Sequence, residues 1–171
     1  MDAAERVRER ILAAVPGAEI EVVAGVQPSL RVDPAHLVAA VKFVKDDPDY
    51  RMDMCTCVSG VDYPDSGVIE IVYHFYSVEK RLGPMILRTC VPREEARCEC
   101  PSLTPLYRGA EFQEREIFDL FGVRFTGHPD LRRILMWDGF VGHPMRKDYV
   151  PEDQDSLEDM EVAVRPEDTI N

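Results

Sequence analysis

Residues 111–149 read EFQEREIFDLFGVRFTGHPDLRRILMWDGFVGHPMRKDY. The pattern predicts a helix over Glu111–Phe121, which Gly122 ends. Residues 123–149 have no regular period and are interrupted by glycine and proline, yet they are rich in large apolar side chains. Disordered segments are poor in such side chains, and structureless loops longer than about 12–15 residues are uncommon in compact domains. We therefore expect this segment to lie along a surface, either of its own chain or of a partner.

The composition of the whole chain is that of a soluble globular protein. It has 171 residues, of which 45% are hydrophobic and 30% are charged. That length suits one domain with an adequate core, because about 150 residues bury roughly 70% of the unfolded surface. No run approaches the ~18 consecutive apolar residues of a membrane helix. The N-terminus has no apolar signal region, so we expect the protein to stay in the cytoplasm or to face it.

Charge is distributed unevenly along the chain. The net charge is −12, which argues against nucleic acid as a partner because phosphate binding needs a basic surface. Residues 150–171 hold eight acidic residues and one basic residue, so this segment contributes −7. Residues 124–149 hold five basic and three acidic residues. The basic segment suits docking on an acidic partner, or it forms an ordinary solvated face.

Hydrophobic periodicity predicts an α+β fold: a mixed, mostly antiparallel sheet with helices on one face, followed by an extended C-terminal arm. Residues 68–78 form the clearest strand, since Ile69, Ile71, Tyr73 and Phe75 alternate along one face. The other predicted elements are helices over residues 2–15 and 33–45, with Asp33 as cap, and strands over 18–24, 29–32, 52–58 and 85–91. We divide the chain into an α+β domain (1–100), a helix with a docking arm (101–149) and an acidic tail (150–171).

Five cysteines include two C-x-C pairs, Cys55 with Cys57 and Cys98 with Cys100. Four thiolates could hold zinc or an iron–sulfur cluster, but structural zinc sites favour two to four intervening residues. Free cysteine is also a common small core residue. We interpret all five as structural thiols, with Cys90 in the core, and expect no metal site.

His128 and His143 each stand in a Gly-His-Pro tripeptide. The repeat is compatible with two docking turns, a metal pair or an acid–base pair. Neither histidine has a plausible cysteine or serine nucleophile nearby in the sequence, and the following proline is typical of a rigid turn. We favour structural, hydrogen-bonding histidines.

The predicted helix over residues 111–121 carries charges on an otherwise apolar circumference. Paired carboxylates such as Glu116 and Asp119 could perform general acid–base chemistry. However, the sequence has no glycine-rich phosphate loop and no dinucleotide fingerprint. A helix that is apolar on most sides is typically buried between two bodies. We therefore expect its acidic residues and Arg115 to form buried pairs, including pairs with the basic segment.

Several motifs together resemble one known family. Glu114-Arg115-Glu116 is followed by Asp119-Leu120-Phe121, then by Gly122–Gly127 and by residues 128–135, His-Pro-Asp-Leu-Arg-Arg-Ile-Leu. Residues 142–149, Gly-His-Pro-Met-Arg-Lys-Asp-Tyr, form a second block, and Val61–Pro64 and Val72–His74 form weaker upstream motifs. This set resembles the 30 kDa subunit, also called the C subunit, of NADH–quinone oxidoreductase (respiratory complex I). The resemblance covers residues 51–149.

The resemblance implies a cofactor-free subunit of the hydrophilic arm of a proton-translocating complex. It implies packing against the large D subunit, which helps form the quinone site, and a peripheral position on the cytoplasmic side of the membrane that is reached only through the complex. Phe112 replaces the usual tryptophan, and the C-x-C pairs are not part of the family pattern. Related subunits occur in membrane-bound hydrogenases, and a free-standing metal-binding protein is a third alternative.

We predict no catalytic, cofactor-binding or metal-binding residue. The predicted partner interface consists of charged, histidine and aromatic side chains: Glu114, Arg115, Glu116, Asp119, His128, Arg132, Arg133, Trp137, His143, Arg146 and Lys147.

Overall fold

The computed structural model describes residues 3–150 of the chain, so the predicted acidic tail lies almost wholly outside the described residues. Its elements include three α-helices, α1 (Ala3–Ala14), α2 (Pro34–Asp46) and α3 (Glu111–Phe121). Its strands are β1 (Ile20–Val23), β2 (Ser29–Val32), β3 (Met54–Tyr63), β4 (Val68–Ser77), β5 (Leu82–Pro92), β6 (Glu99–Pro101) and β7 (Arg124–Thr126). Short 3-10 turns lie at Pro64–Ser66, Glu95–Arg97 and Arg108–Ala110.

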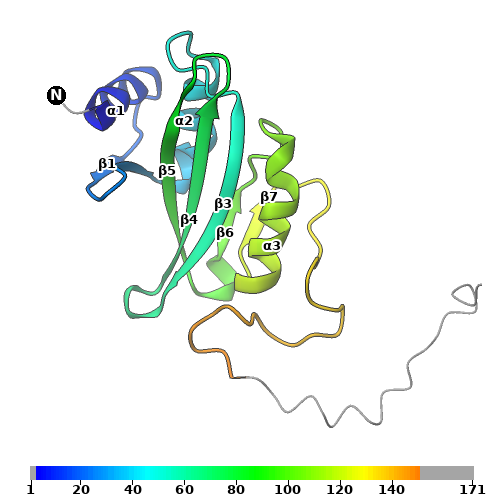
Figure 1. The fold of residues 1–171 in the computed structure, drawn as a ribbon. Coiled ribbons are helices and arrows are strands. Elements are labelled where there is room, and N and C mark those ends of the chain that lie inside the picture. Colours follow the sequence, from blue (N-terminus) through cyan, green and yellow to red (C-terminus); the bar gives the residue numbers. More distant parts are fainter. Residues whose placement is uncertain (1–2, 151–171) are drawn as a thin grey trace, which may run out of the picture.

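The main sheet has five strands in the order β1-β2-β5-β4-β3, and only β2 and β5 pair in parallel. A separate two-stranded parallel sheet joins β6 to β7. Figure 1 shows α3, β6 and β7 lying beside β3, with the chain after β7 descending along α3 and turning beneath it. The predicted α+β class and the mostly antiparallel sheet are confirmed.

One face of the sheet carries the core. The alternation predicted for β4 is confirmed, since the side chains of Ile69, Ile71, Tyr73 and Phe75 are fully buried. Helix α2 packs on this face, and α3 covers it at Gly60, where an added Cβ would lie 2.8 Å from the ring of Phe121. Both helices therefore lie on the same side of the sheet.

The core is continuous across residue 100, the predicted domain boundary. It includes Leu103, Tyr107, Ile117 and Phe125 together with the side chains of β4. The strands β6 and β7 were not predicted because each has only three residues, too few to show a period of two. Strand β3 extends well past the predicted end at residue 58, and a register shift between Cys55 and Cys57 interrupts its alternation.

Asp33 occupies the predicted position before α2, but its side chain does not cap the helix. Its carboxylate instead accepts hydrogen bonds from the backbone N–H of Glu19 (3.2 Å) and from Nδ1 of His36 (2.9 Å). The cap residue thus ties α2 to the entrance of β1.

Candidate docking site on helix α3 and the arm

The C-terminus of α3 is closed by the segment that follows β7, residues 127–149, which we call the arm. A helix leaves its last four carbonyl groups without partners inside the helix. Here each carbonyl accepts a hydrogen bond from Gly122 or from the arm: Phe118 from the N–H of Gly122 (2.9 Å), Asp119 from Nδ1 of His143 (2.9 Å), Leu120 from the N–H of Met145 (3.1 Å) and Phe121 from Nε of Arg146 (2.7 Å).

Gly122 makes this arrangement possible. Its φ of +79° is in the left-handed region, where a side chain is unfavourable. An added Cβ would also lie 2.5 Å from Nε2 of His143 and 3.1 Å from Nη2 of Arg146. The glycine that ends the helix therefore also leaves room for the two side chains that cap it.

The carboxylate of Asp119 organises the middle of the arm. It accepts hydrogen bonds from the backbone N–H groups of Ile134 (3.0 Å), Leu135 (2.7 Å) and Met136 (2.8 Å), and from Nη1 of Arg133 (2.7 Å). Burial alone would raise the pKa of Asp119, but these donors hold the pKa below its ordinary value. The charged form is thus the one that fits the arm.

Glu114 performs a similar task on the preceding turn. Its fully buried carboxylate accepts hydrogen bonds from the hydroxyl of Ser102 (2.5 Å), the N–H of Leu103 (2.7 Å) and the hydroxyl of Thr104 (3.2 Å). Burial raises its pKa, against the effect of these donors. Glu114 therefore connects α3 to the segment after β6.

Arg115 points toward the arm and not toward Asp119, the partner expected from helical spacing. Its Nε and Nη2 atoms donate to the carbonyls of Arg132 (3.1 Å) and Arg133 (3.0 Å). Its guanidinium also lies 5.7 Å from the ring centre of Phe112. Asp119 is paired with Arg133 instead, so the expected buried pair between helix and basic segment is present.

The two Gly-His-Pro histidines hold opposite ends of α3. His128 lies 3.0 Å through Nε2 from the carbonyl of Glu111, at the start of the helix, and accepts through Nδ1 from the N–H of Asp130. His143 donates from Nδ1 to the carbonyl of Asp119, near the end of the helix. Both histidines form structural hydrogen bonds, as the favoured interpretation expected.

The end of the arm is attached to the sheet through two residues absent from the predicted interface, Asp62 and Arg93. Arg93 pairs with Asp62 (2.6 Å) and with Asp148 (2.5 Å), and Asp62 also accepts from the N–H of Lys147 (2.8 Å). Burial would raise the pKa of Asp62, but Arg93 and this N–H keep it low. The Val61–Pro64 motif contained the signal for Asp62, whereas Arg93 had none.

While the backbone of the arm is fixed to the chain, many of its apolar side chains face outward. We call these side chains, with one from α3, the exposed apolar set: Phe112, Ile134, Leu135, Trp137, Val141 and Met145. Leu135 and Trp137 are 56% and 51% exposed. The ring of Trp137 is edge-on to that of Phe140 (4.9 Å between centres), so its orientation is held within the arm.

The predicted interface residues thus fall into two groups. Glu114, Arg115 and Asp119 are buried within the chain, and Arg133, His143 and Arg146 are partly buried and bonded to it. Glu116, Arg132, Trp137 and Lys147 are exposed. The side chain of Arg132 pairs with the neighbouring Asp130 (2.9 Å).

The cysteines do not converge on one point. Cys98 and Cys100 are fully buried, and burial raises the pKa of both Cys55 and Cys100 to about 12, so their thiols stay protonated. Within residues 3–150 there is no group of three or more histidine, cysteine or acidic side chains that could hold a metal ion. Cys90 is only partly buried, so the prediction that it lies in the core is wrong: it pairs across the sheet with Glu70 and points away from Ile69 and Ile71.

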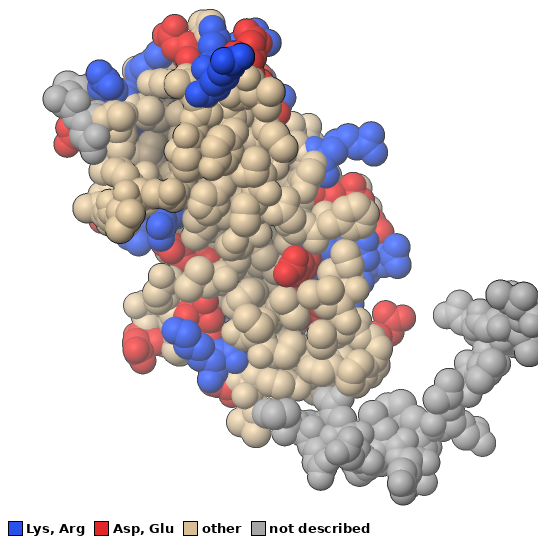
Figure 2. Space-filling view, viewed as in Figure 1, with Lys and Arg blue, Asp and Glu red and all other residues tan. Residues whose placement is uncertain are grey.

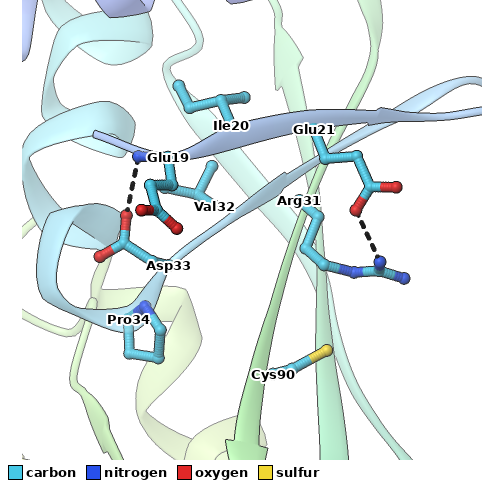
Figure 3. A pocket seen from close by; sticks show the side chains of 8 residues that line it. All are labelled: Glu19, Ile20, Glu21, Arg31, Val32, Asp33, Pro34 and Cys90. Atoms are coloured by element: carbon cyan, nitrogen blue, oxygen red, sulfur yellow. Dashed lines mark hydrogen bonds and ion pairs between the residues drawn. The ribbon is translucent and has the colours of Figure 1, made fainter. Parts of the chain in front are cut away.

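A hollow of about 390 Å³ lies beside β1 and β2 (Figure 3). Arg31 bridges Glu21 (2.9 Å) and the buried Glu70 (3.3 Å), and Cys90 lies on the wall of the hollow. Burial and the charge of Glu70 raise the pKa of Cys90, which disfavours the thiolate that nucleophilic chemistry needs. This geometry gives no basis for catalysis.

Comparisons with known proteins agree with the fold. Residues 30–155 match the family model described as "Respiratory-chain NADH dehydrogenase, 30 Kd subunit". The NADH-quinone oxidoreductase C subunit of Moorella thermoacetica is 44% identical over 132 residues, which are 77% of this chain and 86% of that protein. A second C subunit of the same enzyme, from Rhizobium etli, is 40% identical over 69% of this chain, which spans only 62% of that longer relative.

Two solved structures are similar as well. A chain of the membrane-bound sulfane sulfur reductase, an archaeal respiratory membrane complex, has a TM-score of 0.70 and 25% identity, and the similarity covers 99% of this chain and 100% of that chain. The trypsin-resistant fragment (1-134) of Nqo5 has a TM-score of 0.57 and 27% identity over 74% of this chain and 98% of that chain.

The fold and the site define a class of protein: an α+β domain whose last helix is clasped by an arm that presents apolar side chains. Within that class, the chain belongs to the family of the 30 kDa subunits of respiratory-chain NADH dehydrogenases. No helix among residues 3–150 has the length and apolar character needed to cross a membrane.

Proposed function

We propose that this chain is a structural subunit, without catalytic residues or cofactor of its own, of a proton-translocating NADH–quinone oxidoreductase. Its relatives of known name are subunits of such enzymes, and they support this assignment. The chain would sit in the peripheral part of the complex on the cytoplasmic side and reach the membrane only through other subunits.

The observation that carries the proposal is the exposed apolar set on an arm whose backbone is already fixed. Large apolar side chains exposed together commonly mark protein–protein contacts, and tryptophan is enriched among the residues that contribute most to binding. Because Asp119, His143 and Arg146 order the arm beforehand, docking would cost little conformational entropy. We propose that the large quinone-site subunit, the D subunit of the family's complexes, covers this surface.

A second candidate function is the same structural role in a related respiratory complex with another electron donor or acceptor, such as a membrane-bound hydrogenase. The observation that favours it is the match to the sulfane sulfur reductase chain, which spans nearly the whole of this protein. Purifying the native assembly and measuring NADH-dependent quinone reduction separates the two: absence of that activity in an intact assembly would favour the second.

The docking proposal is tested by Leu135→Asp with Trp137→Asp in the full chain. Both side chains are more than half exposed, so the variant is expected to fold, while charges at a desolvated contact should prevent incorporation into the complex. The measurement is co-purification with the membrane-bound assembly. Val26→Asp, at a fully exposed position in the β1–β2 turn, is the matched control and should co-purify normally.

Normal incorporation of the double variant would reject the arm as the docking surface. Stoichiometric zinc or iron in the purified chain would contradict the cofactor-free role and favour a metal-binding protein.

A further inference from the structure

A second apolar surface lies at the end of the sheet where β4 turns into β5. It consists of two adjoining hollows of about 400 and 430 Å³, which share Leu82 and Gly83 on their walls. The first is bounded by α1, β2 and the start of β5, and the second by β3 and the β4–β5 turn. We call this the turn-end surface.

The turn-end surface is far from the arm. The arm is attached near Asp62, which pairs with Ile69 at the start of β4, whereas Leu82 pairs with Ser77 at the end of β4. A ten-residue strand is about 33 Å long, so the two surfaces lie at opposite ends of the sheet. Figure 1 shows the β4–β5 turn at the top of the molecule and the arm at the bottom.

Most of its lining is apolar. Val78 is 67% exposed, and Met54 and Leu82 are exposed beside it. The hydroxyl of Ser29 lines the first hollow, and it is buried without a hydrogen-bond partner among the described residues. A buried hydroxyl in an apolar wall is unfavourable unless a partner group meets it.

The charged residues on the walls are cationic. Arg6 lines the first hollow and Arg81 the second. The guanidinium of neither has a hydrogen-bond or ion-pair partner among residues 3–150. Most other arginines of the chain are engaged, for example Arg93 with Asp62 and Arg133 with Asp119. The surface therefore offers two unpaired positive charges beside apolar hollows.

We propose that the turn-end surface binds a second polypeptide, distinct from the one that covers the arm, through a segment with apolar side chains next to carboxylates. The apolar side chains fill the hollows, a polar group meets Ser29, and the carboxylates pair with Arg6 and Arg81. The proposal rests on the proposed function, because it makes this subunit a link between two neighbours in one assembly.

A protein segment fits this surface better than a lipid membrane does. Binding to anionic lipid typically uses clusters of four to eight basic residues, and here only Arg6, Arg81 and the adjacent Lys80 are available. The net charge of −12 also opposes approach to an anionic membrane or to a second copy of the chain. The surface is concave at two places, which suits individual side chains.

The test is site-specific photo-cross-linking in cells that assemble the complex. The photoreactive residue benzoylphenylalanine replaces Val78 in one full-length variant and Trp137 in another. Both positions are exposed, so the fold should tolerate them. We expect the probe at residue 78 to capture a polypeptide different from the one captured at residue 137, at a peptide where apolar residues adjoin Asp or Glu.

Charge reversal at the hollows supplies the second arm of the test. Arg6→Glu with Arg81→Glu should lower the cross-linking yield at residue 78 about tenfold, because two attractions become repulsions. Lys42→Glu with Arg97→Glu, which changes the net charge equally at exposed positions elsewhere, should leave the yield unchanged.

The proposal is overturned if the probe at residue 78 captures nothing, a phospholipid, a second copy of this chain, residues 151–171 of the same chain, or the polypeptide captured at residue 137. An unchanged yield after charge reversal would also overturn it. Failure of the proposed docking role gives a different result, namely no capture at residue 137.

Discussion

At the scale of single residues, the charged groups of α3 act as internal connectors. A carboxylate loses hydration when it is buried, and the loss is tolerable only where donors replace the water. Glu114 has three donors and Asp119 has four, and each holds a segment that has no regular structure of its own. Both are fully buried, so neither carboxylate can contact a partner directly in this conformation.

The arm should loosen as the pH falls below neutrality. Burial, together with the charges of Arg146 and Arg133, lowers the pKa of His143 in spite of its bond to Asp119. Since the folded value lies below the unfolded value of about 6.5, His143 contributes stability that is complete above that pH and is lost as pH falls through the folded value. The measurement is hydrogen-exchange protection of the Met145 amide between pH 7.5 and 5.

His143→Gln should remove most of this pH dependence, because glutamine can donate a hydrogen bond but does not titrate in the range. His36→Gln, which alters a histidine on α2, should keep it. Asp119 does not contribute within this window, since its lowered pKa keeps it ionised. Equal pH profiles for the wild type and His143→Gln would show that His143 does not control the arm.

At the scale of elements, the end of α3 and the arm form one unit. The helix supplies the carbonyl groups and the arm supplies the donors, two of them cationic or polar side chains favoured at a helix C-terminus. The sequence predicted both limits of the helix, because Gly122 is a strong stop signal. It did not predict which groups would cap the helix, because His143 and Arg146 are more than twenty residues away in the chain.

Gly122→Ala should destabilise the chain more than Gly127→Ala. Both glycines have positive φ, +79° and +82°, so each substitution incurs roughly 1–2 kcal/mol of backbone strain. Only at position 122 would the added methyl group also displace His143 and Arg146, at a further cost of about 1–3 kcal/mol. Urea unfolding measures the difference, and equal losses at both positions would contradict the close contact.

At the scale of the whole molecule, the arm is both part of the fold and a surface for others. The expectation from sequence allowed the apolar segment to lie on its own chain or on a partner. The structure places its backbone on α3 and at the edge of the sheet, while leaving the exposed apolar set in solvent. Figure 2 shows the described surface in one view, with charged side chains mainly around the margin.

Two adjacent arginines should separate folding from assembly. Arg133→Glu would place a second carboxylate beside the buried Asp119, and breaking such a pair costs about 3–5 kcal/mol. Arg132→Glu changes a side chain that is 70% exposed, so stability should fall by less than about 1 kcal/mol while incorporation into the complex is reduced. Thermal unfolding and co-purification measure the two effects, with Lys42→Glu as the control for charge.

Loss of stability in Arg132→Glu as large as in Arg133→Glu would contradict this division. Normal assembly of a stable Arg132→Glu variant would remove Arg132 from the proposed interface. For Glu116, Trp137 and Lys147, which are also exposed, a role in the interface stays a prediction.

The sequence by itself determined the regular elements and the family. Periodicity is a local property, and glycine and proline act on their own neighbours, so α2, α3 and the alternation of β4 followed from short windows of residues. The tertiary structure alone decided where the irregular segment goes. Its position depends on hydrogen bonds between residues far apart in the chain, such as Asp62 with Lys147 and Asp119 with Leu135, and no local pattern encodes such a pairing.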